Sequence, residues 1–169
     1  WRNIFACRIR YPIRFLKSNN QKWSDFLIIL FQESYWVSDS ASKYVSPIIE
    51  TVLSKYEIPT RYIGKRGDED LRSFSDEDAV KIMNIFQAKG FEAQSTFLIG
   101  LDQVNSMRSI HDHSEHDKLR HKSNIAYVAF TRAASELFVY YSEITEEISL
   151  LADCASKVFS FKFDLSLED

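Results

Sequence analysis

Glycine is scarce in this sequence, with four residues among 169, and none of them opens a P-loop. A P-loop needs two glycines five positions apart followed by Lys and Ser or Thr, so that backbone amides cradle phosphate groups. The GxSxG nucleophile elbow and the HExxH zinc pattern are also absent. We therefore do not expect this chain alone to hold a nucleoside triphosphate in a P-loop, or to be a hydrolase of those types.

Long apolar runs and cysteines are rare as well. The longest apolar runs, such as Phe26 to Phe31, are far too short to span a bilayer, and no signal peptide opens the chain. The two cysteines, Cys7 and Cys154, lie in apolar surroundings, which favours buried reduced thiols over a disulfide or a metal pair. We expect a cytoplasmic protein without a membrane partner.

The composition that is present indicates a folded protein. Hydrophobic residues make up 45% and aromatic residues 14% of the chain, which excludes a disordered or low-complexity sequence. The net charge of −3 gives no global sign of nucleic-acid binding. The length fits one domain over residues 1–169, and because Trp1 opens the chain we expect it to be a fragment of a longer protein.

Apolar periodicity predicts alternating strands and helices. The expected strands cover 25–31, 58–64, 79–86, 95–101 and 137–141, and the expected helices cover 12–17, 40–56, 125–133 and 146–161. Apolar side chains point both ways in the strand that begins at Leu137, which indicates a sheet covered on both faces. Strands separated by helices or long crossovers predict an α/β layered fold with a mainly parallel sheet flanked by helices.

One charge occupies an unusual place in the predicted helix 125–133. Arg132 follows Val128 by four residues and Ile125 by seven, so it lies at the end of an apolar stripe. The residues alone favour a snorkelling arginine, whose stem covers apolar surface while its head stays in water.

All four histidines fall within the segment from His111 to His121, together with Asp112, Glu115 and Asp117. Such side chains are able to form a zinc or transition-metal site. Their spacing matches no specific metal signature, and the segment is predicted to be a surface loop. A solvated loop is therefore favoured, and no metal site is expected.

The turn QAKGFEAQ joins two predicted strands and carries Lys89, Gly90 and Glu92. It offers a cation, a flexible backbone amide and a carboxylate. Open α/β sheets bind ligands at the carboxyl ends of their strands, where we expect this turn after Phe86. The alternative is that Lys89 and Glu92 are an ordinary solvated pair.

Two segments carry a family resemblance. VKIMNIFQAKGFEAQSTFLIGL (80–101) followed by IAYVAFTRAASELFVYY (125–141) resembles motifs V and VI of superfamily 1 helicases of the UvrD/Rep/PcrA kind. The resemblance extends over roughly residues 23–142 and implies the C-terminal, second RecA-like domain, a three-layer α/β fold. In that family ATP with Mg²⁺ lies between two RecA-like domains. In that family the first, N-terminal domain supplies the P-loop and the magnesium ligand, and the resemblance implies the same for the parent protein.

The resemblance implies roles for individual residues. Arg132 matches the motif VI arginine that reaches the γ-phosphate, which favours an arginine finger over a snorkelling side chain. Its planar fork suits charge that is spread over several phosphate oxygens. Glu92 matches the glutamate that contacts the ribose, and Lys89 and Gly90 match its neighbours.

The sequence departs from the family at the residues that face single-stranded DNA or RNA. The family's Thr and His of motif V are Asn84 and Phe86 here. Asn84 keeps hydrogen-bonding groups, and Phe86 offers a ring on which a base can stack. Two functions stay open: a domain of an ATP-dependent helicase or translocase, and a helicase-like nucleotide-binding or regulatory module without strand translocation. In both cases we expect the isolated chain to be inactive as an ATPase.

Overall fold

Five parallel strands form the centre of the protein. The computed structural model describes residues 13–14, 17, 20–31, 34–38, 41–44, 46–63, 77–102, 115–141, 144–146 and 148–149. The sheet has the order β4-β5-β1-β6-β7, and every neighbouring pair is parallel. Its strands are β1 (Phe26–Leu30), β4 (Thr60–Tyr62), β5 (Val80–Asn84), β6 (Ala93–Ile99) and β7 (Ala133–Tyr140).

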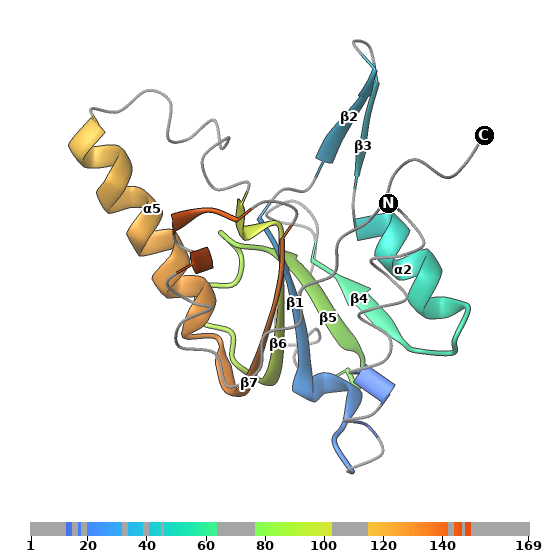
Figure 1. Ribbon diagram of the computed structural model, residues 1–169. Helices are drawn as coiled ribbons and strands as arrows, with labels where there is room; N and C mark the ends of the chain where they lie inside the picture. The colour runs from blue at the N-terminus through green and yellow to red at the C-terminus, as the bar shows by residue number, and fades with distance from the viewer. Residues whose placement is uncertain are drawn as a thin grey trace.

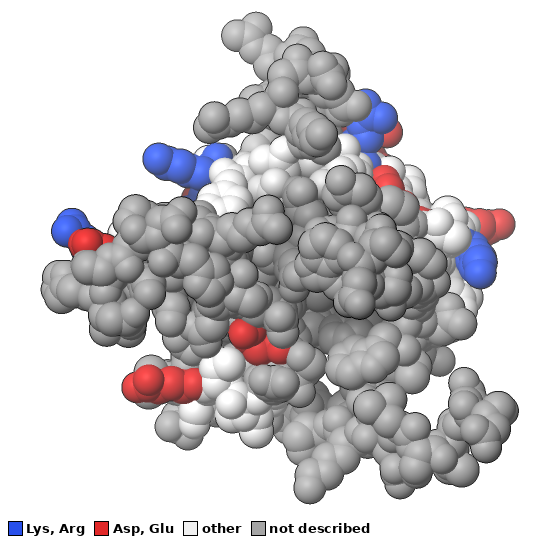
Figure 2. All heavy atoms as spheres, turned by 90° about the horizontal axis from the view of Figure 1, so that it is seen from above, with Lys and Arg blue, Asp and Glu red and all other residues white. Residues whose placement is uncertain are grey.

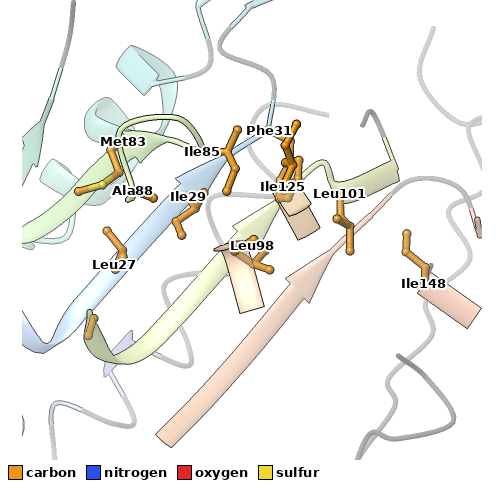
Figure 3. Close-up of a cluster of buried hydrophobic side chains, with 12 residues drawn as sticks. Leu27, Ile29, Phe31, Met83, Ile85, Ala88, Leu98, Leu101, Ile125 and Ile148 are labelled. Atoms are coloured by element: carbon orange, nitrogen blue, oxygen red, sulfur yellow. The ribbon is translucent and has the colours of Figure 1, made fainter. Parts of the chain in front are cut away.

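The central strand explains why this sheet is covered on both faces. All five residues of β1 are buried, as expected for a continuous apolar run between two parallel neighbours. On one face Leu27 and Ile29 pack with Ile125 and Ala129 of α5 (Glu115–Phe130), and Figure 3 shows this cluster. On the other face Phe26, Ile28 and Leu30 of β1 pack with α2 (Ser46–Ser54).

This arrangement of helix, sheet and helix is visible in Figure 1, where α5 and α2 lie on opposite sides of the strands. It confirms the predicted α/β fold with helices flanking a parallel sheet. Phe138 and Tyr140 of β7 pack on the α2 face and Val139 packs on the α5 face, so this strand also points apolar groups both ways.

The predicted helix 40–56 is wrong in its first part. Residues Ser34–Ser38 and Ala41–Tyr44 instead form an antiparallel hairpin of β2 and β3, separate from the main sheet. The helix begins at Ser46, which puts Pro47 in its first turn. A proline further inside a helix would clash with the carbonyl four residues earlier, so the helix cannot extend back to residue 40.

The predicted helix 125–133 is wrong at both ends. α5 begins at Glu115, so His116 and His121 lie in a helix and not in the predicted surface loop, while His111 and His113 lie outside the described residues. At the other end α5 stops at Phe130, and β7 begins at Ala133, earlier than predicted. Among the described residues no group of His, Cys, Asp and Glu is arranged to hold a metal ion.

The remaining predictions concern the chain ends. Residues 13, 14, 17, 146, 148 and 149 are helical, in agreement with the predicted terminal helices, whereas Cys7, Cys154 and most of the predicted helix 146–161 lie outside the described residues. In the part of the chain that the structure describes, every helix is too short or too polar to cross a bilayer.

Candidate functional site

The segment from Ile85 to Glu92 runs from the end of β5 back to the start of β6. We call the side of the sheet where the strands finish its carboxyl-terminal edge, and the side where they start its amino-terminal edge. β5 and β6 are parallel, so this segment leaves the carboxyl-terminal edge after Asn84 and must reach the amino-terminal edge before Ala93. It crosses the α5 face, where Ile85 and Ala88 are buried in the cluster of Figure 3. The expectation that the turn lies at the carboxyl ends of the strands is thus right for Phe86 and wrong for Glu92.

Arg132 lies at the amino-terminal edge, in the two-residue turn between α5 and β7. Its side chain is half-buried and makes three hydrogen bonds. Nε donates to the carbonyl oxygen of Val128 (3.0 Å), Nη1 to that of Phe91 (3.0 Å), and Nη2 to Oγ1 of Thr131 (2.9 Å). The guanidinium therefore binds protein acceptors and does not simply extend into water as a snorkelling head would.

The structure brings Arg132 to the motif V turn. The carbonyl that it binds belongs to Phe91, between Gly90 and Glu92, and the backbone N–H of Ala93 donates to the carbonyl of Arg132 (3.0 Å). The side chains of Lys89 and Glu92 are exposed. Gly90 and Glu92 thus flank the residue whose carbonyl Arg132 binds, at the starts of β6 and β7.

Helix electrostatics favour a cation at this position. The last carbonyl groups of an α-helix have no partner within the helix and carry partial negative charge. Arg132 donates to one of them, that of Val128. Among the described residues, its bonds use three of the five N–H groups of a guanidinium and leave one on each terminal nitrogen.

Gly90 has φ +91°, in the left-handed region that glycine adopts without a steric penalty. A Cβ at this position would meet nothing within 4 Å. The requirement for glycine thus comes from the backbone conformation, which sets the direction of the peptide just before the Phe91 carbonyl.

The carboxyl-terminal edge carries the two predicted nucleic-acid residues. Oδ1 of Asn84 accepts a hydrogen bond from the N–H of Gln87 (2.9 Å), while Oε1 of Gln87 accepts one from the N–H of Asn84 (3.3 Å). This reciprocal pair has the form of a capping box and fixes the turn after β5. Phe86, inside the turn, is 57% exposed, so it is not a core residue.

The charged residues that the structure describes are dispersed around this edge. Figure 2 is seen from above, that is, from the end of the molecule where the strands finish in Figure 1. In that view the described Lys and Arg residues lie apart around the rim, with Asp and Glu residues between them. Among the described residues, the ring of Phe86 is exposed at this edge, while Lys and Arg form no cluster in this view.

Two residues of this site were missed in the sequence, Gln87 and Thr131. Gln87 was detectable, because Asn followed three residues later by Gln is a capping-box pattern. The contact between Thr131 and Arg132 depends on how α5 ends, and the predicted helix boundary hid it.

Two described carboxyl groups have shifted pKa values, and neither was a predicted site residue. Burial raises the pKa of Glu50 on α2, and the positive charge of Arg61 on β4 partly opposes this effect. A hydrogen bond from the backbone N–H of Ser24 (2.9 Å) lowers the pKa of Asp78. Ser24 lies in the short 3₁₀ helix η1 (Trp23–Asp25), which precedes β1.

Comparison with known proteins agrees with the motif assignment. The model of the UvrD-like helicase C-terminal domain matches residues 65–144, a range that contains both motifs. Curated protein sequences gave no match. Among solved structures, the C-terminal part of the Fun30 ATPase domain aligns with a TM-score of 0.39 and 17% identity. That alignment covers 89% of this chain and 43% of the Fun30 chain, so the present chain spans less than half of that structure.

Proposed function

We propose that this chain, whose residues 65–144 match the model of the UvrD-like helicase C-terminal domain, is the second RecA-like domain of an ATP-dependent superfamily 1 helicase or translocase. In this proposal the chain completes an ATP site and contacts single-stranded DNA or RNA. A P-loop domain on the N-terminal side of the same parent protein is its partner. The parent's whole activity belongs to the proposal.

The observation that carries the proposal is the placement of Arg132. Its guanidinium is anchored by three hydrogen bonds at the amino-terminal edge, beside the turn of Gly90 and Glu92, and it keeps one N–H on each terminal nitrogen. Two parallel N–H groups form a fork that matches two phosphate oxygens. An anchored fork stabilises charge that develops on a transferring phosphoryl group without reorganising during the reaction.

The neighbouring groups suit the rest of a nucleotide. The exposed carboxylate of Glu92 is an acceptor for ribose hydroxyl groups, and Lys89 adds an exposed cation. These donors and acceptors fit phosphate and sugar, whereas Mg²⁺ needs oxygen ligands that we assign to the first domain. Mg²⁺ bound there would neutralise phosphate charge.

The decisive experiment replaces Arg132 in the parent protein that contains the first domain. We expect Arg132→Ala to lower kcat for ATP hydrolysis by about 10³-fold or more, the scale of arginine fingers. Arg132→Lys should rescue kcat poorly, because an ammonium group lacks the fork. Arg120→Ala, which removes an exposed arginine from α5, is the matched control and should keep normal turnover.

Arg132→Ala is also expected to affect the stability of the folded protein. Arg132 binds the Val128 carbonyl at the carboxyl end of α5 and the Phe91 carbonyl before β6, so Arg132→Ala should also lower the melting temperature. A lowered melting point therefore does not argue against the finger. A kcat within a few-fold of wild type, counted per folded molecule, would refute the proposed role.

A second candidate function is a helicase-like module that binds or senses nucleotide without moving along a strand. It is favoured by Asn84, whose side-chain oxygen serves the turn through its hydrogen bond with Gln87. Its replacement of the family's Thr thus has a structural use in this chain.

Phe86 separates the two candidates. If it stacks on a base, Phe86→Ala in the parent should weaken binding of single-stranded oligonucleotides by about 1–3 kcal/mol. The ring is exposed, so the substitution should leave folding nearly unchanged. Affinities must be compared at one stated salt concentration. Equal affinity of variant and wild type would favour the module without translocation.

A further inference from the structure

The hydroxyl group of Thr131 lies between the end of α5 and the guanidinium of Arg132. Oγ1 is 2.9 Å from the carbonyl oxygen of Tyr127 and 3.2 Å from that of Val128. It is also 2.9 Å from Nη2 of Arg132. Three contacts thus meet at one oxygen atom.

The chemistry of these partners fixes the direction of the hydroxyl proton. A carbonyl oxygen only accepts, and a guanidinium only donates. Thr131 must therefore donate its proton toward the helix carbonyls, which leaves an oxygen lone pair facing Nη2. The same carbonyl of Val128 also accepts from Nε of Arg132, so the hydroxyl and the guanidinium are tied to one helix turn.

Three acceptors then define the plane of the guanidinium. The carbonyl of Val128 holds Nε, the carbonyl of Phe91 holds Nη1, and the hydroxyl of Thr131 holds Nη2. The first two acceptors are backbone atoms. Thr131 supplies the third acceptor, a side-chain oxygen, at Nη2.

We infer that Thr131 is a positioning residue, which acts through Arg132 by holding Nη2 so that both remaining N–H groups face a nucleotide phosphate. The inference rests on the proposed function of Arg132 and assigns no contact between Thr131 and the nucleotide. A misaligned fork loses transition-state contacts more than ground-state binding, because the strongest charge develops in the transition state.

The test uses Thr131→Val and Thr131→Ser in the parent protein, with ATP and a single-stranded oligonucleotide. Valine keeps the shape of threonine but removes the hydroxyl, while serine keeps the hydroxyl. Loss of one hydrogen bond that orients the fork should lower kcat about five- to tenfold for Thr131→Val, with KM for ATP nearly unchanged. Thr131→Ser should retain kcat within about twofold.

A double substitution distinguishes positioning from a purely structural role. Thr131→Val also removes hydrogen bonds from the end of α5, so it should lower the melting temperature in any background. If Thr131 acts through Arg132, adding Thr131→Val to Arg132→Ala should not reduce kcat further. A structural role would instead produce similar losses of kcat in both backgrounds and would overturn the inference.

The outcomes for the two proposals are separable. Near-normal kcat in Arg132→Ala would refute the proposed function, and the positioning role with it. A strong loss in Arg132→Ala together with wild-type or raised kcat in Thr131→Val would refute the positioning role alone.

Discussion

Arg132 has one observed role, at the end of α5, and one proposed role, toward a phosphate. Its charge at the end of an apolar stripe is visible in the sequence, and motif VI implies a phosphate contact. The sequence does not reveal that the guanidinium also donates a hydrogen bond to a carbonyl at the carboxyl end of α5, because that contact depends on the helix stopping at Phe130. The two roles are compatible, because among the described residues the bonds to protein acceptors leave one N–H on each terminal nitrogen.

At Gly90 we expect a substitution to destabilise the protein through the backbone conformation, and not through a clash with neighbouring atoms. Gly90→Ala should destabilise the protein by about 1–2 kcal/mol, the cost of placing a residue with a Cβ in the left-handed region. Nothing lies within 4 Å of the added Cβ, so no clash should add to this cost. Gly90→Asn is the control and should cost less, because asparagine tolerates this region better.

Chemical denaturation of both variants measures the Gly90 effect. A loss well above 2 kcal/mol, or an equal loss for alanine and asparagine, would contradict the explanation through φ.

At the scale of elements, sequence patterns located the buried strands better than the polar ones. β1, β5 and β6 are apolar runs with buried residues on both faces, and all three were predicted. The hairpin of β2 and β3 has mixed polar and aromatic residues without clear alternation, so helical spacing was assigned to part of it. The first half of α5 is rich in charged residues and lacks an apolar stripe, which hid it from the same reasoning.

The hydrogen bond between Asp78 and η1 joins two elements that are far apart in sequence. The carboxylate accepts a hydrogen bond from the backbone N–H of Ser24, which lowers the pKa of Asp78 below its ordinary value. Because the pKa of Asp78 is lower in the folded state than in the unfolded state, the ionised carboxylate stabilises the folded protein at pH values above the unfolded-state pKa. This stabilisation is lost as the pH falls through the folded-state pKa. We expect Asp78→Ala to lower the free energy of unfolding at pH 7 by less than about 1 kcal/mol, since the group is exposed.

Urea unfolding at pH 7 and near pH 3 tests this contribution. The difference between wild type and Asp78→Ala should shrink at the lower pH, as Asp78 becomes protonated. Asp78→Asn keeps an acceptor and removes the titration, so its difference from Asp78→Ala should not change with pH. A wild-type advantage that grows on acidification would contradict the pKa direction.

At the scale of the whole molecule, the order of the strands in the sheet explains how two motifs that are separate in the sequence lie side by side. The parallel sheet brings motifs V and VI together, because β6 and β7 are neighbours and each motif turn precedes one of these strands. This adjacency was not deducible from spacing, since the sequence does not specify which strands pair. The same topology separates Phe86 from Arg132, one at each edge of the sheet.

We expect the isolated 169-residue chain to show no ATPase activity, because it lacks a P-loop to hold the phosphates. Adding single-stranded oligonucleotides should not induce turnover. Steady-state phosphate release after repurification is the measurement, with Arg132→Ala as the control for contaminating enzymes. Turnover that persists through repurification and falls in Arg132→Ala would contradict the two-domain reading.

The central position of β1 has a consequence for folding kinetics. Its two hydrogen-bonding neighbours, β5 and β6, both come much later in the chain, although β1 is the earliest strand of the sheet. Contacts between residues distant in sequence require closure of long loops before they contribute free energy, and they slow folding. During synthesis the run FLIIL must therefore emerge and wait, with both of its edges unpaired, until β5 and β6 have been made. Its apolar character, which makes it the best-buried strand of the finished domain, makes it the segment most exposed to misassociation while the chain is incomplete.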